Sequence, residues 1–217
     1  LGAYLAGTGT LCRYMPNPVA SSFLKLNKPI PQSPHALFAI PLSLEKGADI
    51  GIAAMRILAE TRPDIRLSIF GFGPNRDEAA GLRSRIPKSA NILPWTHRNK
   101  MPNLFSSATV VVGRLRLGSL GIVELEAMAT GRPLIVQLSG ALGEIEEYYN
   151  DEPPVTTCDT PHLVADAVIR FADDPAETIR LGAHSRKWVT EYHSETRVAM
   201  IYQEEYRNLL EGRDGAP

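Results

Sequence analysis

Short apolar segments alternate with amphipathic helical segments along most of this 217-residue chain, and this alternation constrains the fold more than any other feature. Strands are expected at the apolar runs, and helices where apolar residues recur every three to four positions. The expected strands are 35–40, 65–70, 91–94, 109–112 and 134–136, and the main expected helices are 48–60, 77–85, 99–106, 161–172, 175–190 and 194–211. Strands separated by helices of this length form parallel β-α-β units. The sequence therefore predicts an α/β fold, a Rossmann-like doubly wound parallel sheet flanked by helices, with C-terminal helices after it.

A glycine-bearing loop precedes a short helix in the middle of the chain. The loop is Gly-Ser-Leu-Gly at 118–121, Gly131 is expected to cap the C-terminal end of the helix, and Pro133 ends it. Free N–H groups at a helix N-terminus carry a partial positive charge of about +0.5 and attract anions. Glu126 lies one to two turns inside the helix, where its carboxylate can accept hydrogen bonds from ligand hydroxyls. These features favour a nucleotide or nucleotide-sugar pocket, although 125–129 is also an ordinary run of helix formers.

Three loops that follow expected strands should lie along one edge of the sheet. They are Gly-Phe-Gly at 71–73, Trp-Thr-His at 95–97, and the loop at 118–121. In parallel sheets of this class, ligands bind at the carboxyl ends of the strands. The segment 71–73 is similar to part of a dinucleotide fingerprint, but Arg76 occupies the third glycine position and no ribose-binding acid follows the next strand. A nicotinamide-dependent enzyme is therefore disfavoured.

The charge balance and the cysteine content exclude several classes of protein. The 23 basic and 24 acidic residues nearly cancel, so no overall positive field points to nucleic acid. No apolar run approaches the ~18 residues that span a bilayer. Cys12 and Cys158 are the only cysteines, without a Cys-x-x-Cys pattern, which argues against a structural zinc site and favours a reducing, cytoplasmic compartment.

The five histidines give no clear general base. His35 is expected at the entry to a strand, and His162, His184 and His193 are expected to be exposed on the terminal helices. His97 lies on one of the edge loops, and two interpretations stay open for it: a contact to a base or phosphate, or an ordinary surface residue.

Five segments, in order, carry a resemblance to a known family. They are Met15–Phe23, Glu45–Asp49, Phe70–Pro74, Leu120–Pro133 and the closing segment 172–192. Together they resemble the carboxyl-terminal, nucleotide-sugar-binding domain of family 4 glycosyltransferases of the GT-B type, over nearly the whole chain. The resemblance implies three parts: an interdomain linker with a remnant of a missing N-terminal domain at 1–34, the nucleotide-sugar-binding α/β domain at 35–192, and a C-terminal helix and tail at 193–217.

The resemblance also implies how the phosphates of the donor would be held. Lys46 would contact the donor diphosphate and stabilise it as it leaves. The backbone N–H groups of Ser119, Leu120 and Gly121 would cradle the same diphosphate, and Gly118 belongs to the same loop.

The nucleoside half of the expected site comes from the resemblance as well. Glu126 would bind the ribose hydroxyls. The residues expected along the base and backbone of the donor are Trp95, Thr96 and His97, which would lie against the base, and Gly71 and Gly73, which would let the chain pass close to the donor.

The chain departs from the family pattern at two positions. Pro41 stands where the family usually has an arginine on the diphosphate, and Gly118 stands where it has a first glutamate on the transferred sugar. A leaving diphosphate needs a second cation. We hypothesise that Arg114 or Arg116 supplies it, and the alternative that both only solvate the loop stays open. The sequence lacks an Asp-x-Asp pair, so no metal and no other cofactor is expected.

The expected function is that of a retaining glycosyltransferase domain, which binds a UDP- or GDP-linked hexose and supports its transfer to a hydroxyl acceptor, a glycan or a lipid-linked one. The missing N-terminal domain would carry the acceptor site, so the isolated chain is expected to turn over little or nothing. A lipid-linked acceptor would place the full-length enzyme peripherally at a membrane. Two alternatives stay open: a degenerate, non-catalytic GT-B module that scaffolds a partner, and a related GT-B enzyme such as a nucleotide-sugar epimerase or a phosphorylase.

Overall fold

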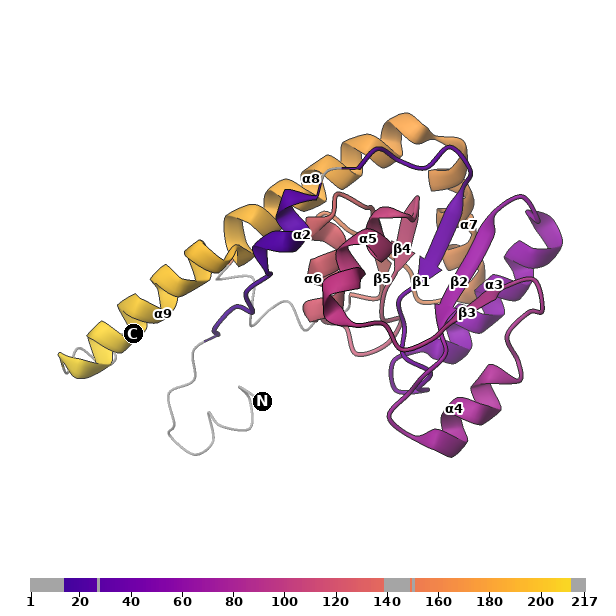
Figure 1. The fold of residues 1–217 in the computed structure, drawn as a ribbon, viewed down its shortest axis with the longest axis horizontal. Coiled ribbons are helices and arrows are strands. Elements are labelled where there is room, and N and C mark those ends of the chain that lie inside the picture. The colour runs from indigo at the N-terminus through magenta and orange to yellow at the C-terminus, as the bar shows by residue number, and fades with distance from the viewer. Residues whose placement is uncertain (1–13, 27, 139–148, 150, 212–217) are drawn as a thin grey trace.

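A computed structural model, which describes residues 14–26, 28–138, 149 and 151–211, contains a six-stranded sheet of order β3-β2-β1-β4-β5-β6 (Figure 1). The strands are β1 (His35–Phe38), β2 (Arg66–Phe70), β3 (Asn91–Leu93), β4 (Val110–Val112), β5 (Leu134–Val136) and β6 (Thr156–Thr157). Every neighbouring pair is parallel. The strand order reverses between β1 and β4, which creates the crevice where ligands bind in such sheets. The predicted doubly wound α/β fold is confirmed.

Helices cover both faces of the sheet (Figure 1). They are α2 (Ser21–Lys25), α3 (Ala48–Thr61), α4 (Arg76–Arg83), the 3-10 turn η1 (Arg98–Lys100), α5 (Met101–Ser106), α6 (Ile122–Ala129), α7 (Pro161–Asp173), α8 (Pro175–His193) and α9 (Glu195–Leu210). Alternate residues of β1 enter two separate cores: Ala36 and Phe38 pack with α3 and α7, whereas Leu37 packs with α5, α6 and α8. Both faces of the strand are buried, as in other parallel sheets covered by helices.

The segment before β1 packs on the α/β body at several points. Phe23 of α2 is 1% exposed and its ring lies against that of Phe105. The buried Arg132 donates hydrogen bonds to the carbonyl oxygens of Lys28 and Pro29 at 2.9 and 3.0 Å. The sequence predicted neither α2 nor β6, because neither shows a periodic apolar pattern. The predicted domain boundaries stay a prediction, and residues 1–13 and 212–217 lie outside the described residues.

The last helix, α9, continues from α8 and extends away from the sheet (Figure 1). The helix was expected at 194–211 from its recurring apolar residues, but Val198 is the one buried residue of α9, while Tyr206 and Leu210 are 59% and 88% exposed. None of the helices in the described part is long and apolar enough to cross a membrane. The expected cytoplasmic location stays a prediction.

Two histidines are buried, one of them against expectation. His35 lies at the start of β1, as predicted, with its ring nitrogens 2.9 Å from the Ser107 carbonyl and the Ser68 hydroxyl. His193 was predicted to be exposed, and this was wrong because it is 1% exposed. Its ring lies between the carbonyl of Asn17 and the hydroxyl of Tyr149, each at 2.9 Å, where the N-terminal segment crosses the end of α8.

Stability should therefore fall as the solution is acidified. Burial lowers the pKa of both His35 and His193, so the unfolded chain takes up protons first, from about pH 6.5 downward. We expect the free energy of unfolding to drop between pH 7 and 5 by up to about 1.4 kcal/mol per pH unit for each histidine. Urea denaturation at several pH values measures this drop in the free energy of unfolding. His193→Gln should make the free energy of unfolding depend less on pH, whereas the control His162→Gln, at an exposed position, should leave the dependence unchanged. An unchanged slope in His193→Gln contradicts the assignment.

Candidate active site

The loops that follow β1, β2 and β4 pack against one another at the carboxyl edge of the sheet. The N–H of Leu42 donates to the carbonyl of Phe72 at 2.8 Å, which joins the loops after β1 and β2. The N–H of Leu115 donates to the carbonyl of Lys46 at 3.0 Å, which joins the loops after β4 and β1. The edge is thus one continuous surface of interlocked loops.

Glycines allow these loops to come so close. A Cβ on Gly73 would lie 2.9 Å from the carbonyl carbon of Leu42 and still closer to its oxygen, and one on Gly71 would collide with the side chain of Ile92. Gly47 adopts a left-handed φ of 80° and abuts Leu115. Contacts within the protein are therefore enough to explain Gly71 and Gly73, and their predicted closeness to the donor stays a prediction.

The backbone of Lys46 is held beside the loop after β4 by the hydrogen bond from Leu115. Its side chain is 26% exposed, and its amine lies 3.3 Å from the carboxylate of Glu45, which is itself 65% exposed. An ion pair this exposed is weak, so the amine remains available to an anion at the edge.

Two of the four backbone N–H groups of the loop at 118–121 already donate hydrogen bonds within the protein. Gly118, with a φ of 61°, donates its N–H to Oε1 of Gln137 at 3.0 Å. Gly121 was predicted to offer a free N–H, but this group donates to Oε2 of Glu124 at 3.0 Å, because a glutamate at the third helical position reaches back to the N-cap. The N–H groups of Ser119 and Leu120 have no partner among the described residues.

Arg114 is turned inward beneath this loop. Its backbone N–H and its Nε donate to Oε1 of Glu124 at 3.1 and 3.2 Å, and its Nη2 donates to the carbonyl of Ser119 at 3.2 Å. The side chains of Arg114 and Glu124 are only 17% and 3% exposed. This buried pair shapes the loop from below, a role that the sequence did not reveal.

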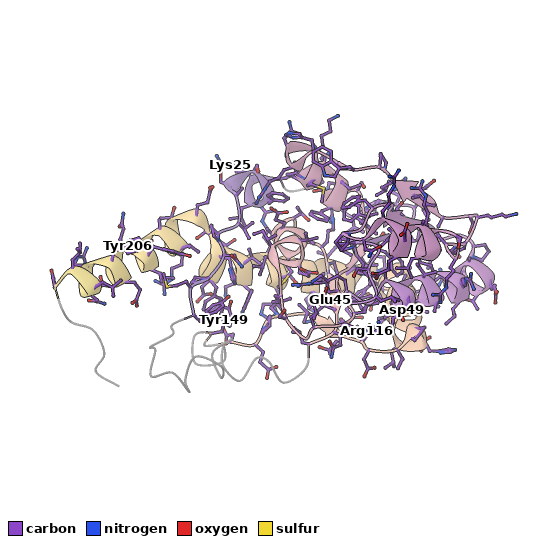
Figure 2. All side chains as sticks on the ribbon, turned by 90° about the horizontal axis from the view of Figure 1, so that it is seen from below. Lys25, Glu45, Asp49, Arg116, Tyr149 and Tyr206 are labelled. Atoms are coloured by element: carbon purple, nitrogen blue, oxygen red, sulfur yellow. The ribbon has the colours of Figure 1, made fainter. Side chains whose placement is uncertain are left out.

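Arg116 is held on the outside of the same edge. Its two terminal nitrogens lie 3.0 and 2.9 Å from the carboxylate oxygens of Asp49, and one also donates to the carbonyl of Leu44 at 2.6 Å (Figure 2). Both hypothesised phosphate ligands therefore have partners within the protein, and Arg114 is too buried to solvate the loop, which was the alternative interpretation. Phosphate binding by either arginine stays a hypothesis.

Glu126 of α6 is the buried carboxylate of the edge. It is 4% exposed, and its Oε1 accepts a hydrogen bond from Nη2 of Arg98 at 2.6 Å. Burial raises the pKa of Glu126, and the charge of Arg98 offsets part of this effect. Sequence reasoning missed Arg98, since nothing in the pattern connects two residues so far apart in the chain.

The segment before Arg98 presents an exposed aromatic side chain. Trp95 is 69% exposed, and its ring meets that of His97 edge-on at 5.9 Å. The hydroxyl of Thr96 donates to the carbonyl of Pro94 at 3.1 Å, which fixes the turn. The ion pair of Arg98 therefore ties a loop that carries an accessible aromatic plane to the buried carboxylate of Glu126.

Residues 25–188 match a family model described as glycosyl transferases group 1. The chain belongs to the glycosyl transferases group 1 family. The matched residues include the whole sheet and the loops that follow β1, β2, β3 and β4. The interlocked edge described above is therefore part of the family domain.

Curated relatives of this group 1 domain are similar over most of its length. The chain is 32% identical over 148 residues to alpha-D-kanosaminyltransferase of Streptomyces kanamyceticus, covering 65% of this chain and 37% of that protein. It is 30% identical over 151 residues to the GDP-mannose-dependent alpha-(1-6)-phosphatidylinositol dimannoside mannosyltransferase of Mycobacterium tuberculosis, covering 67% and 37%. The chain thus spans well under half the length of these relatives.

Solved structures share the fold of the group 1 domain. Sucrose-phosphate synthase of Thermosynechococcus elongatus superposes with a TM-score of 0.76 at 23% identity, over 97% of this chain and 56% of that one. Anabaena Alr3699/HepE, solved in complex with UDP-glucose, superposes with a TM-score of 0.65 at 17% identity, over 97% and 52%. At these identities the comparison shows a common fold, the GT-B half predicted from the sequence.

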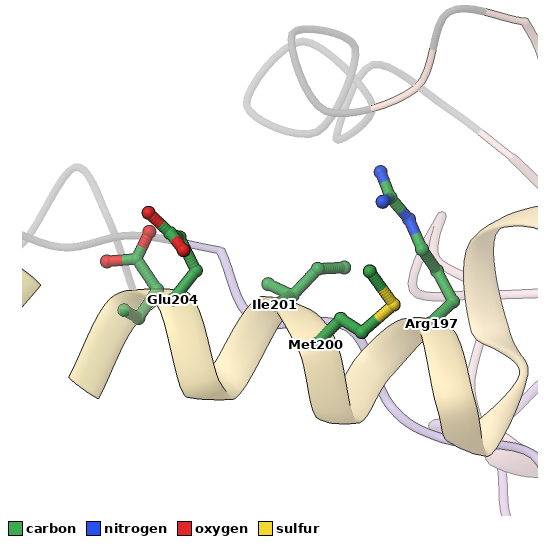
Figure 3. Close-up of a pocket in the computed structure, with 5 residues that line it drawn as sticks. Arg197, Met200, Ile201 and Glu204 are labelled. Carbon is green, nitrogen blue, oxygen red and sulfur yellow. The ribbon is translucent and has the colours of Figure 1, made fainter. Parts of the chain in front are cut away.

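Two hollows formed by described residues lie away from the edge loops. One of about 360 Å³ lies on α9 and is lined by Arg197, Met200, Ile201, Glu204 and Glu205 (Figure 3). The other, of about 270 Å³, lies between the segment 29–34 and the junction of α7 and α8, at the amino ends of the strands. Neither is lined by a residue of the predicted donor site.

Proposed function

We propose that this chain is the donor-binding half of a retaining glycosyltransferase, which binds a nucleoside-diphosphate sugar at the carboxyl edge of the sheet and supports sugar transfer to a hydroxyl acceptor. The observation that carries the proposal is the buried carboxylate of Glu126 on the same edge as the N–H groups of Ser119 and Leu120, for which the described part of the chain offers no partner. Membership in the group 1 family supports the same reaction class.

In the proposed complex, each part of the donor meets a group suited to its chemistry. Glu126 accepts hydrogen bonds from the ribose hydroxyls, and Trp95 offers its plane to the base. Lys46 and the N–H groups at 119–120 stabilise the diphosphate, which carries more negative charge as it leaves. We propose that the reaction needs no metal, since the sequence has no Asp-x-Asp pair. The acceptor and the remaining catalytic groups are assigned to a second domain.

The printed names of relatives guide the choice of donor. The mycobacterial relative is named for GDP-mannose and an alpha linkage, the Streptomyces relative for an alpha product, and one structural neighbour was solved with UDP-glucose. These names support an α-linked product formed with retention, and they keep both GDP- and UDP-linked hexoses as candidate donors.

Calorimetric titration of the chain with UDP and GDP tests the proposal. We expect one of them to bind, and Lys46→Ala and Glu126→Gln each to weaken binding about tenfold, or about 1.4 kcal/mol. Lys88→Ala is the matched control, because Lys88 is exposed on the turn before β3, at the opposite edge of the sheet. No binding of either nucleotide at millimolar concentration would instead favour a non-catalytic module.

One observation favours this second candidate, a non-catalytic scaffold. Gly118 has a φ of 61° and the preceding Leu117 a φ of 81°, so both residues adopt left-handed backbone at the position where the resemblance expects a sugar-binding glutamate. A glutamate at 118 would be strained in this backbone. Analysis of products formed by the full-length enzyme separates a transferase from a scaffold and from an epimerase.

A further inference from the structure

The ion pair between Arg98 and Glu126 is unequal in exposure. The side chain of Arg98 is 62% exposed and that of Glu126 is 5% exposed, and the two meet at 2.6 Å. Within the described part of the chain, Arg98 is the cation that contacts Glu126, and it comes from the loop after β3 rather than from α6 itself. An exposed residue on one loop thus fixes the orientation of a buried carboxylate on a helix.

The ion pair with Arg98 uses only one of the two carboxylate oxygens of Glu126. Arg98 donates to Oε1 of Glu126, and Oε2 has no partner among the described residues. An ionised carboxylate accepts hydrogen bonds at about four lone-pair sites, so one arginine N–H does not saturate it. The two neighbouring hydroxyls of a ribose need two acceptor sites, and these remain on Glu126 without displacement of Arg98.

We propose that Arg98 is a positioning residue: it holds Oε1 of Glu126 so that the free lone pairs of the carboxylate face the ribose hydroxyls of the donor. The inference rests on the proposed function and deepens it. Arg98 contacts the carboxylate of Glu126, which in the proposed complex contacts the ribose.

The charge of Arg98 matters as well as its shape. A protonated carboxyl donates one hydrogen bond in place of accepting it, which leaves a ribose hydroxyl without its acceptor. Burial raises the pKa of Glu126, and Arg98 is the charged group that opposes this rise. Loss of Arg98 therefore shifts Glu126 further toward the neutral form, and nucleotide binding becomes sensitive to mild acid.

The test compares Arg98→Gln, Arg98→Lys and the control Lys100→Gln, which replaces an exposed lysine of the same turn, η1. We expect Arg98→Gln to weaken binding of the preferred nucleotide about tenfold at pH 7 and more at pH 6, and Arg98→Lys to restore part of it. Lys100→Gln should bind like the wild type. In the Glu126→Gln background, Arg98→Gln should have no further effect. A nucleotide without the 2′ and 3′ hydroxyls should bind wild type and Arg98→Gln equally.

A second readout separates this proposal from the proposed function. The titration of the Glu126 carboxyl, followed by ¹³C NMR in the nucleotide-free chain and assigned with Glu126→Gln, should move to higher pH in Arg98→Gln. Tighter nucleotide binding by Arg98→Gln would overturn the proposal, because Arg98 would then compete with the ribose. An unchanged Glu126 titration with normal nucleotide binding would overturn it too. Failure of the wild type to bind any nucleotide overturns the proposed function, and the ribose role with it.

Discussion

Replacing Glu124 with alanine should lower the free energy of unfolding by about 3–5 kcal/mol, because it leaves a buried guanidinium without its carboxylate. Glu124 accepts hydrogen bonds from the backbone N–H and the Nε of Arg114 and from the N–H of Gly121. Water has little access to the pair of side chains, since Arg114 is 17% and Glu124 is 3% exposed. Urea denaturation at neutral pH measures the loss.

The double variant Arg114→Met with Glu124→Leu is the control for this prediction. Replacing both members of a buried pair with apolar residues removes the unpaired charge, so the double variant should recover the part of the loss that this charge causes. The backbone N–H groups of Arg114 and Gly121 still lack their acceptor, so the recovery should be incomplete. The stability of Glu124→Gln should lie between those of the wild type and Glu124→Ala, since the amide oxygen of glutamine still accepts one hydrogen bond. A cost below about 1 kcal/mol for Glu124→Ala would show that Arg114 finds water instead of staying buried.

The sheet and most helices were predictable because their patterns are local. The expected strand at 134–136 matches β5 at both ends, and the expected helix at 48–60 ends one residue before α3 does. Apolar spacing and the prolines and glycines at the boundaries determine these elements within a few residues of chain. The short α2 and β6 have no such pattern, and tertiary packing stabilises them instead.

The chemistry of the candidate site was predictable only in part. The inward carboxylate of Glu126 was expected from its place in the helix, and the structure buries it. Its partner Arg98, and the pairing of Arg114 with Glu124, depend on which loop crosses which helix, and sequence spacing does not encode this. The same reason explains why Gly121 was expected to have a free N–H: the sequence analysis gave Glu124 no role, and its contact with the loop appears only in the folded chain.

The two departures from the family pattern, Pro41 and Gly118, lie at the diphosphate and at the transferred sugar, and neither lies at the nucleoside. The groups that would hold the nucleoside, Glu126 and the loop of Trp95, are connected through Arg98. On the side of the transferred sugar, Gly118 has no side chain, and its N–H is bound to Gln137. We therefore expect nucleoside recognition to be the stronger property of this chain, and the sugar to be recognised with less help from it.

Gly73→Ala should lower the free energy of unfolding by about 3 kcal/mol, the second large effect that we expect. The new methyl group would press on the backbone carbonyl of Leu42, which cannot rotate away as a side chain would. The loops after β1 and β2 must then separate, which also breaks the hydrogen bond from Leu42 to Phe72. Because the loop after β1 carries Lys46, nucleotide affinity should fall together with stability.

Gly81→Ala makes the same chemical change where there is room for it. A Cβ on Gly81 meets nothing within 4 Å, and this glycine lies inside α4, where alanine is the better helix former by about 1 kcal/mol. Gly81→Ala should therefore stabilise the chain and leave nucleotide binding unchanged. If the interlocked loops are rigid, urea denaturation should show Gly73→Ala to be less stable than the wild type and Gly81→Ala to be more stable. Nucleotide titration should show weaker binding for Gly73→Ala alone. If Gly73→Ala is as stable as the wild type, the loops yield easily, and the edge they form is too soft to hold Lys46 in one place against a diphosphate.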